Sequence, residues 1–110
     1  MPTKTNCVTL RGKVTSPPTV RELPSGDTIV TFRLSVARAR SAMTARSKAS
    51  SDWVDCAAWT ARTRRTVERW QVGDTVEVQG ALRRRFYRAA GGSTTRLEIE
   101  VMRARQPAPS

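Results

Sequence analysis

The sequence predicts an all-β fold, a small barrel of five strands with one short helix between the third and fourth strands. Two observations predict this fold. Apolar and polar residues alternate over five separate stretches, which is the pattern of strands with one buried face. Between the third and fourth stretches, Val67 and Trp70 stand three residues apart in an arginine-rich run, as on a helix with one apolar stripe. We therefore expect a helix at residues 60–70, with Trp70 in the core and Gly73 in the turn that follows.

The predicted strands occupy most of the chain. In the second of them, Phe32 and Leu34 belong to a regular alternation of apolar and polar residues. The pair Pro17-Pro18 interrupts the chain after the first strand, because proline cannot donate to a β-ladder. Residues 23–27 contain proline and glycine in the order of a turn. The five predicted strands cover residues 7–14, 28–37, 53–59, 75–88 and 94–102.

The third predicted strand carries the most unusual side chains. Alternation directs Val54, Cys56 and Ala58 into the core and turns Trp53 and Trp59 outward. Two indoles on the outer face are unusual, because large aromatic surface left in water contributes nothing to folding. The two indoles either pack under a loop or a neighbouring subunit, or they form a platform on which nucleic-acid bases stack.

A long basic segment, residues 38–52, separates the second and third predicted strands. It is rich in Ser, Thr and Ala, and its only acid is Asp52. A loop of this length inside a small domain is usually functional or disordered. We interpret it as a mobile cationic flap between two strands of a hairpin. Its basic residues are Arg38, Arg40, Arg46 and Lys48.

The last two predicted strands form a hairpin around a glycine-containing tip. Alternation directs Leu82, Phe86 and Leu97 into the core. The outward residues include Arg85, Tyr87 and Glu98.

This order of five strands and one helix is that of the OB fold, a Greek-key barrel that the helix plugs at one end. A β-sandwich is the alternative, for which five strands are few. The OB domain is expected to span residues 1–103, followed by a short disordered end at residues 104–110.

The charge of the chain points to a polyanionic partner. Lys and Arg number 20 against 9 acidic residues, a net charge of +11, which favours nucleic acid or an anionic membrane surface. Histidine is absent, there are two cysteines, and no glycine-rich phosphate loop is present, so we expect no enzyme, no metal and no cofactor. No stretch is long enough to span a membrane and no signal-peptide pattern is present, so the expected location is the cytoplasm.

Motifs spread along the chain carry a family resemblance. They are Asn6-x-Val8-x-Leu10-x-Gly12, Pro18-x-x-Arg21-x-x-Pro24-Ser25-Gly26, Phe32-x-Leu34, Trp53-x-x-x-x-x-Trp59 and Gly73-x-x-Val76-x-Val78-x-Gly80-x-Leu82. In this order and spacing, from about residue 6 to residue 101, the sequence closely resembles bacterial single-stranded DNA-binding proteins. The resemblance implies an OB fold, a homotetramer, and binding of single-stranded DNA without sequence preference in replication, recombination or repair, on the DNA of the nucleoid.

The resemblance also implies which side chains act. Trp53, Trp59 and Tyr87 match positions whose aromatic residues stack on bases, while Arg40 stands where a further tryptophan is common. Arginine and lysine side chains on the flap and the outer strand faces are expected to bind phosphates. These residues are Arg11, Arg33, Arg38, Arg40, Arg46, Lys48, Arg83, Arg84 and Arg85.

Three expectations concern partners. First strands pair around a twofold axis in this family, so Cys7 could form an intersubunit disulfide, although a reducing cytosol argues against it. No acid follows Glu100, so recruitment of repair proteins through an acidic tail is not expected, as in a specialised paralogue. An RNA-binding module remains an alternative, because OB barrels bind both DNA and RNA. Another alternative is an adaptor of the replication restart machinery, which keeps the barrel but mainly contacts other proteins.

Overall fold

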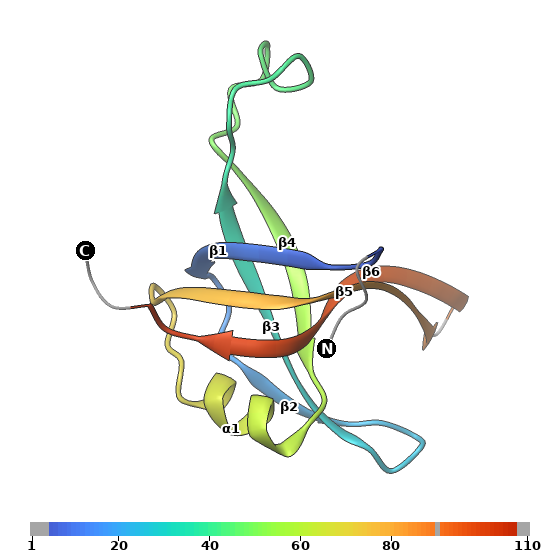
Figure 1. The fold of residues 1–110 in the computed structure, drawn as a ribbon. Coiled ribbons are helices and arrows are strands. Elements are labelled where there is room, and N and C mark those ends of the chain that lie inside the picture. Colours follow the sequence, from blue (N-terminus) through green and yellow to red (C-terminus); the bar gives the residue numbers. More distant parts are fainter. Residues whose placement is uncertain (1–4, 90, 108–110) are drawn as a thin grey trace.

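The computed structural model of the protein describes residues 5–89 and 91–107, without the side chains of residues 87–89. It contains one helix and six strand segments (Figure 1). In chain order they are β1 (Val8–Val14), β2 (Thr19–Glu22), β3 (Thr28–Ala37), β4 (Ser51–Ala58), α1 (Ala61–Glu68), β5 (Thr75–Ala89) and β6 (Gly92–Arg105).

Five of the strands close into a barrel. The sheet runs in the order β1-β5-β6-β4-β3, and β1 pairs again with β3 through Lys13↔Ser35 and Val14↔Leu34. All neighbours are antiparallel except β4 and β6, which are parallel. Gly12 permits the closure, because a Cβ atom there would collide with the carbonyl oxygen of Ser35. The predicted five-stranded OB barrel with one helix is confirmed.

Strand β2 was not predicted. Its four residues pair antiparallel with β3 from Thr19↔Thr31 to Glu22↔Thr28, outside the closed ring. All four side chains of β2 are exposed. Since neither face of this strand is buried, its sequence lacks the alternation by which a half-buried strand is recognised.

The core fills the barrel and its end next to α1. Thr60 caps the helix by accepting a hydrogen bond from the backbone N–H of Thr63. Trp70 follows the helix, is 5% exposed, and meets the ring of Phe32 edge-on at 5.4 Å between centroids. The predicted helix and the predicted burial of Trp70 are both confirmed. The remaining core side chains are Val14, Val30, Leu34, Cys56, Ala58, Val67, Val76, Val78, Ile99 and Val101.

The far halves of β5 and β6 leave the barrel as a two-stranded arm (Figure 1). The prediction that Leu82, Phe86 and Leu97 lie in the core is therefore wrong: Phe86 is 74% exposed, Leu97 50% and Leu82 47%. Alternation assigns these residues to the same side of the strands as Ile99, which is buried. Beyond the barrel, however, no second layer covers that side. Glu98, predicted to face outward, is 3% exposed, and its carboxylate pairs with Arg85.

The flap projects from the barrel between β3 and β4 (Figure 1). At its base, the N–H of Arg38 donates to the carbonyl oxygen of Ser50, and the Arg38 guanidinium pairs with Asp52 at 3.0 Å. Within the flap, the Thr44 hydroxyl donates to the carbonyl oxygen of Ala39 at 2.7 Å. The flap is therefore a loop with internal turns.

The end of β6 differs from the predicted strand end. Strand β6 continues to Arg105, past the predicted strand end at Met102. Its pairing with β5 shifts register between Gln79 and Gly80 of β5. Of the end predicted to be disordered, residues 108–110 lie outside the described residues.

Among the described residues, no helix has the length and apolar character needed to cross a bilayer.

Candidate nucleic-acid interface

Strand β4 places both outward tryptophans on one face of the barrel. Trp53 is 65% exposed and Trp59, just after the end of the strand, is partly exposed. They are six residues apart, which is about 20 Å along an extended strand. Asp55 and Ala57 lie between them on the same face. The two indoles are thus far enough apart to contact different bases of one strand.

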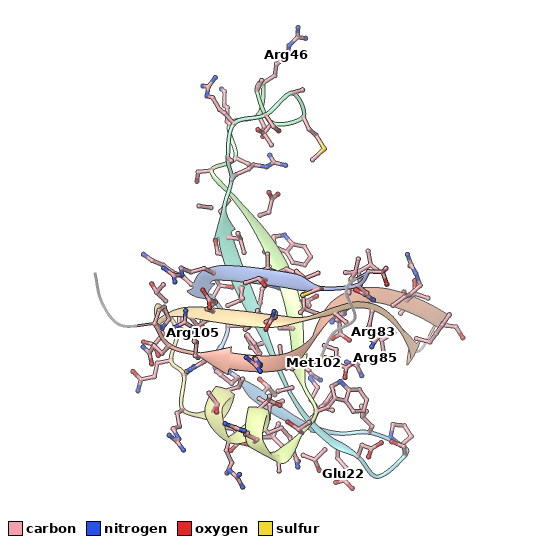
Figure 2. The ribbon with its side chains drawn as sticks, in the orientation of Figure 1. Glu22, Arg46, Arg83, Arg85, Met102 and Arg105 are labelled. Atoms are coloured by element: carbon pink, nitrogen blue, oxygen red, sulfur yellow. The ribbon has the colours of Figure 1, made fainter. Side chains whose placement is uncertain are left out.

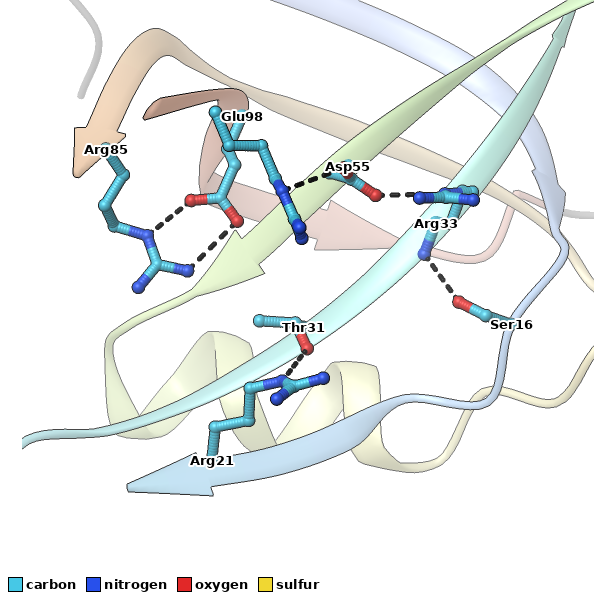
Figure 3. A network of polar contacts seen from close by, with 8 residues as sticks. Ser16, Arg21, Thr31, Arg33, Asp55, Arg85 and Glu98 are labelled. Carbon is cyan, nitrogen blue, oxygen red and sulfur yellow. Dashed lines mark hydrogen bonds and ion pairs between the residues drawn. The ribbon is translucent and has the colours of Figure 1, made fainter. Parts of the chain in front are cut away.

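Trp53 is paired with an arginine from the neighbouring strand. The guanidinium carbon of Arg33 lies 4.0 Å from the centroid of the Trp53 ring. The Arg33 Nε donates to Asp55 Oδ1 at 3.0 Å (Figure 3). From the other side, Arg96 Nε approaches Asp55 Oδ2 at 4.0 Å. One carboxylate therefore holds two guanidinium groups beside the first tryptophan.

Trp59 has an arginine beside it in the same way. The guanidinium carbon of Arg85 lies 6.0 Å from the centroid of the Trp59 ring. Arg85 donates through Nε and Nη2 to the two carboxylate oxygens of Glu98, the second at 3.1 Å (Figure 3). The side chain of Arg85 is 18% exposed and that of Glu98 is 5% exposed, so this fork is held in place.

Two hollows accompany these pairs. One, of about 390 Å³, is lined by Arg33, Asp55, Glu98 and residues of β2 and β3. The other, of about 120 Å³, lies against Trp59 and also reaches Glu98. Glu98 borders both hollows. We call the surface that carries these two hollows and the two tryptophans the tryptophan face; its members are Trp53, Trp59, Arg21, Arg33, Arg85 and Arg96.

Sequence reasoning missed two cations of this face. Arg96 was predicted only to point outward, and its place beside Asp55 needs the register of β6 against β4. Arg21 lies on β2, lines the larger hollow and donates through Nε to the Thr31 hydroxyl at 3.2 Å. In the sequence, Arg21 is part of a motif that does not indicate on which face of the barrel its side chain lies.

The arginine run on β5 is divided between the two sides of the arm. All three arginines line the Trp59 hollow, and Arg83 pairs with Glu100 at 2.9 Å. Arg84 has the opposite strand parity and donates to the Thr95 hydroxyl at 3.0 Å. The backbone of Tyr87 pairs with Thr94, but its side chain lies outside the described side chains. The stacking role of Tyr87 therefore stays a prediction.

The flap carries its cations away from the tryptophan face. Arg40, Arg46 and Lys48 are exposed, and within the described part of the chain none of them has an ion-pair partner. Arg46 lies at the outer end of the flap (Figure 2). These residues can meet a polyanion only if it extends past the barrel or if the flap folds over it.

Arg11 belongs to a different cluster. Arg11 and Arg105 both pair with Glu77, at 3.2 and 2.9 Å. The hydrogen bond from Arg105, and then that from Arg11, hold the pKa of Glu77 below its ordinary value. A hollow of about 590 Å³ adjoins Glu77 and Arg105, and none of the described aromatic side chains lines it. This cluster therefore offers no described aromatic ring on which a base could stack.

The two cysteines differ in exposure. Cys56 is fully buried in the barrel, and burial raises the pKa of its thiol, so it is inert at neutral pH. Cys7 is exposed beside β5, where the Gln79 side-chain amide approaches its Sγ at 3.6 Å. Among the described residues, no three His, Cys, Asp or Glu side chains gather to hold a metal ion.

Comparison with known proteins agrees with this geometry. The sequence model of the single-strand binding protein family matches residues 5–106. No curated protein matches the sequence. Among solved structures, the Plasmodium falciparum SSB in complex with ssDNA superposes with a TM-score of 0.69 at 25% identity, over 92% of this chain and 90% of that one. A deletion variant of the single-stranded DNA binding protein from Thermus aquaticus superposes with a TM-score of 0.68 at 21% identity, over 96% of this chain and 42% of that one, and so shows the shared fold.

Proposed function

Because the chain belongs to the single-strand binding protein family, we propose that it binds single-stranded DNA without sequence preference. The observation that carries the proposal is the pair of outward tryptophans, each beside an arginine, on one face of an OB barrel. A base has a flat face that stacks on an indole whatever its identity, which accounts for the lack of sequence preference. The proposed role is binding and protection of the strand, with no chemistry on it.

Phosphates are proposed to bind the arginines and lysines around the tryptophan face and on the flap. Each neutralised phosphate releases condensed counterions, so the affinity falls as salt rises. Duplex DNA is disfavoured, because its bases already stack on one another and cannot reach the indoles. This role fits DNA replication, recombination or repair on nucleoid DNA in the cytoplasm.

Titration of intrinsic tryptophan fluorescence with a single-stranded oligonucleotide tests this proposal. We expect single strands to quench the tryptophan fluorescence strongly and duplex to quench it little. The logarithm of the binding constant should fall linearly with the logarithm of the salt concentration. An RNA oligonucleotide of the same sequence serves as the comparison for the alternative of RNA binding. Absence of binding at low salt would overturn the proposal.

We also propose that the protein assembles as a homotetramer. Strand β1 bonds to β5 from Val8 to Lys13, whereas β3 reaches it only at Lys13 and Val14. Within the described residues, the other edge of β1 is thus unpaired over most of its length, and such an edge can pair with a second copy. The uncovered side of the arm adds an apolar stripe made of Leu82, Phe86 and Leu97.

Light scattering and non-reducing gels test the assembly. In reducing buffer we expect a mass four times that of the 12.2 kDa chain. If Cys7 lies at a twofold axis, oxidised protein gives a dimer band that Cys7→Ser abolishes. The matched control is Cys56→Ser, which leaves the band because the Cys56 thiol is buried. A monomer mass contradicts the tetramer, and a band that persists in Cys7→Ser contradicts the disulfide.

A further inference from the structure

The tryptophan face contains two carboxylates where a phosphate-binding surface would be expected to have none. Asp55 lies on β4 between the two tryptophans, and its side chain is 15% exposed. Glu98 lies beside it on β6 and is 3% exposed. A negative charge near a bound phosphate is repulsive, so by charge alone each of these acids weakens DNA binding. The hydrogen bonds of these two carboxylates indicate what they contribute to the site.

Asp55 determines where the Arg33 guanidinium lies. Arg33 stands directly opposite Asp55 in the β3–β4 register, and Trp53 is opposite Ser35. From this position, the Arg33 side chain reaches diagonally to cover the indole at 4.0 Å while its Nε donates to Asp55 at 3.0 Å. Its backbone N–H is also fixed, by a hydrogen bond to Ser16 Oγ at 3.0 Å (Figure 3).

Trp53 therefore has one covered face and one open face. Arg33 lies over one side of the ring, yet the residue is still 65% exposed. An exposed indole with no contact would sample several rotamers, and ordering it would cost free energy on binding. The guanidinium removes much of this freedom before DNA arrives.

We propose that Asp55 is a positioning residue for base stacking, an inference that rests on the proposed function. Acting through Arg33, it orients the Trp53 indole so that a base stacks on the open face, in the order base, indole, guanidinium. Asp55 itself need not touch the DNA.

The Asp55→Asn variant tests this inference, because charge and positioning predict opposite results. The substitution raises the net charge by one, so charge alone predicts tighter binding. The Arg33 anchor changes from a charged to a neutral hydrogen bond, and its weakening predicts binding about two- to fivefold weaker at the same salt, measured by anisotropy of a labelled single-stranded oligonucleotide. The slope of log affinity against log salt should not decrease, since no phosphate contact is removed.

The matched control is Glu22→Gln, which makes the same change of charge on β2. Glu22 is exposed, and the described residues give it no ion pair; it lies at the opposite end of the molecule from Arg46 (Figure 2). We expect this variant to bind single strands as tightly as the parent protein or slightly more tightly. Binding by Asp55→Asn that equals or exceeds binding by Glu22→Gln overturns the inference.

Two further variants show whether Asp55 acts through the stack. In a Trp53→Ala background, Asp55→Asn should no longer weaken binding, because there is no indole to orient. Arg33→Lys keeps the charge but loses the planar group, and it should weaken binding about as much as Asp55→Asn does. This second variant decides the question if Asp55→Asn does not fold. Failure of the unaltered protein to bind single strands would instead overturn the proposed function.

Discussion

Replacing Trp70 with alanine is expected to lower the free energy of unfolding by about 3–5 kcal/mol. The residue is 5% exposed, closes the end of the barrel beside α1, and meets Phe32 edge-on. Its removal leaves a cavity that the surrounding strands cannot collapse to fill. Since small domains are stable by only about 5–15 kcal/mol, the variant should be largely unfolded under mild denaturant. Urea unfolding followed by far-ultraviolet circular dichroism measures this loss.

The Trp70→Phe variant is the control for this result. Phenylalanine keeps an aromatic ring next to Phe32 and leaves a smaller cavity, so we expect a smaller loss of stability. A loss below about 1 kcal/mol for Trp70→Ala would contradict the packing described here. At temperatures where Trp70→Phe is folded, its affinity for single strands should match that of the parent protein, because Trp70 does not lie on the tryptophan face.

The second large effect concerns binding. Trp53→Ala is expected to weaken binding of single-stranded DNA about 5- to 150-fold, the equivalent of about 1–3 kcal/mol for one stacked base. Its side chain is largely exposed, so the melting temperature should change little. Anisotropy of a labelled oligonucleotide gives the affinity without relying on the fluorescence of the residue removed.

Val72→Ala provides the matched control for Trp53→Ala. Val72 is also an exposed apolar residue, at 57%, but it lies in the turn after α1 and lines neither hollow of the tryptophan face. Its removal should leave the affinity unchanged. Equal affinities of Trp53→Ala and the parent protein would show that the indole is no platform, even if arginines still bound the phosphates.

Local patterns predicted the elements whose two faces differ. The β3 strand has a buried and a solvated face, so its alternation is regular and its position was predicted to the residue. Strand β2 has no buried face, so nothing in its sequence separates it from a loop. Phe86 kept the strand parity expected of it, but the barrel ends before that position and leaves it exposed.

The sequence alone determined the strands with one buried face, the helix, the buried Trp70 and the outward tryptophans, because each depends on residue spacing along one element. Only the tertiary structure decided which charged residues meet. Arg33, Asp55 and Arg96 come from three strands, and their contacts depend on the registers of β4 against β3 and β6. Register depends on long-range packing, which no local pattern encodes. The sequence therefore predicted a stacking surface, and the fold showed the carboxylates that hold its arginines in place.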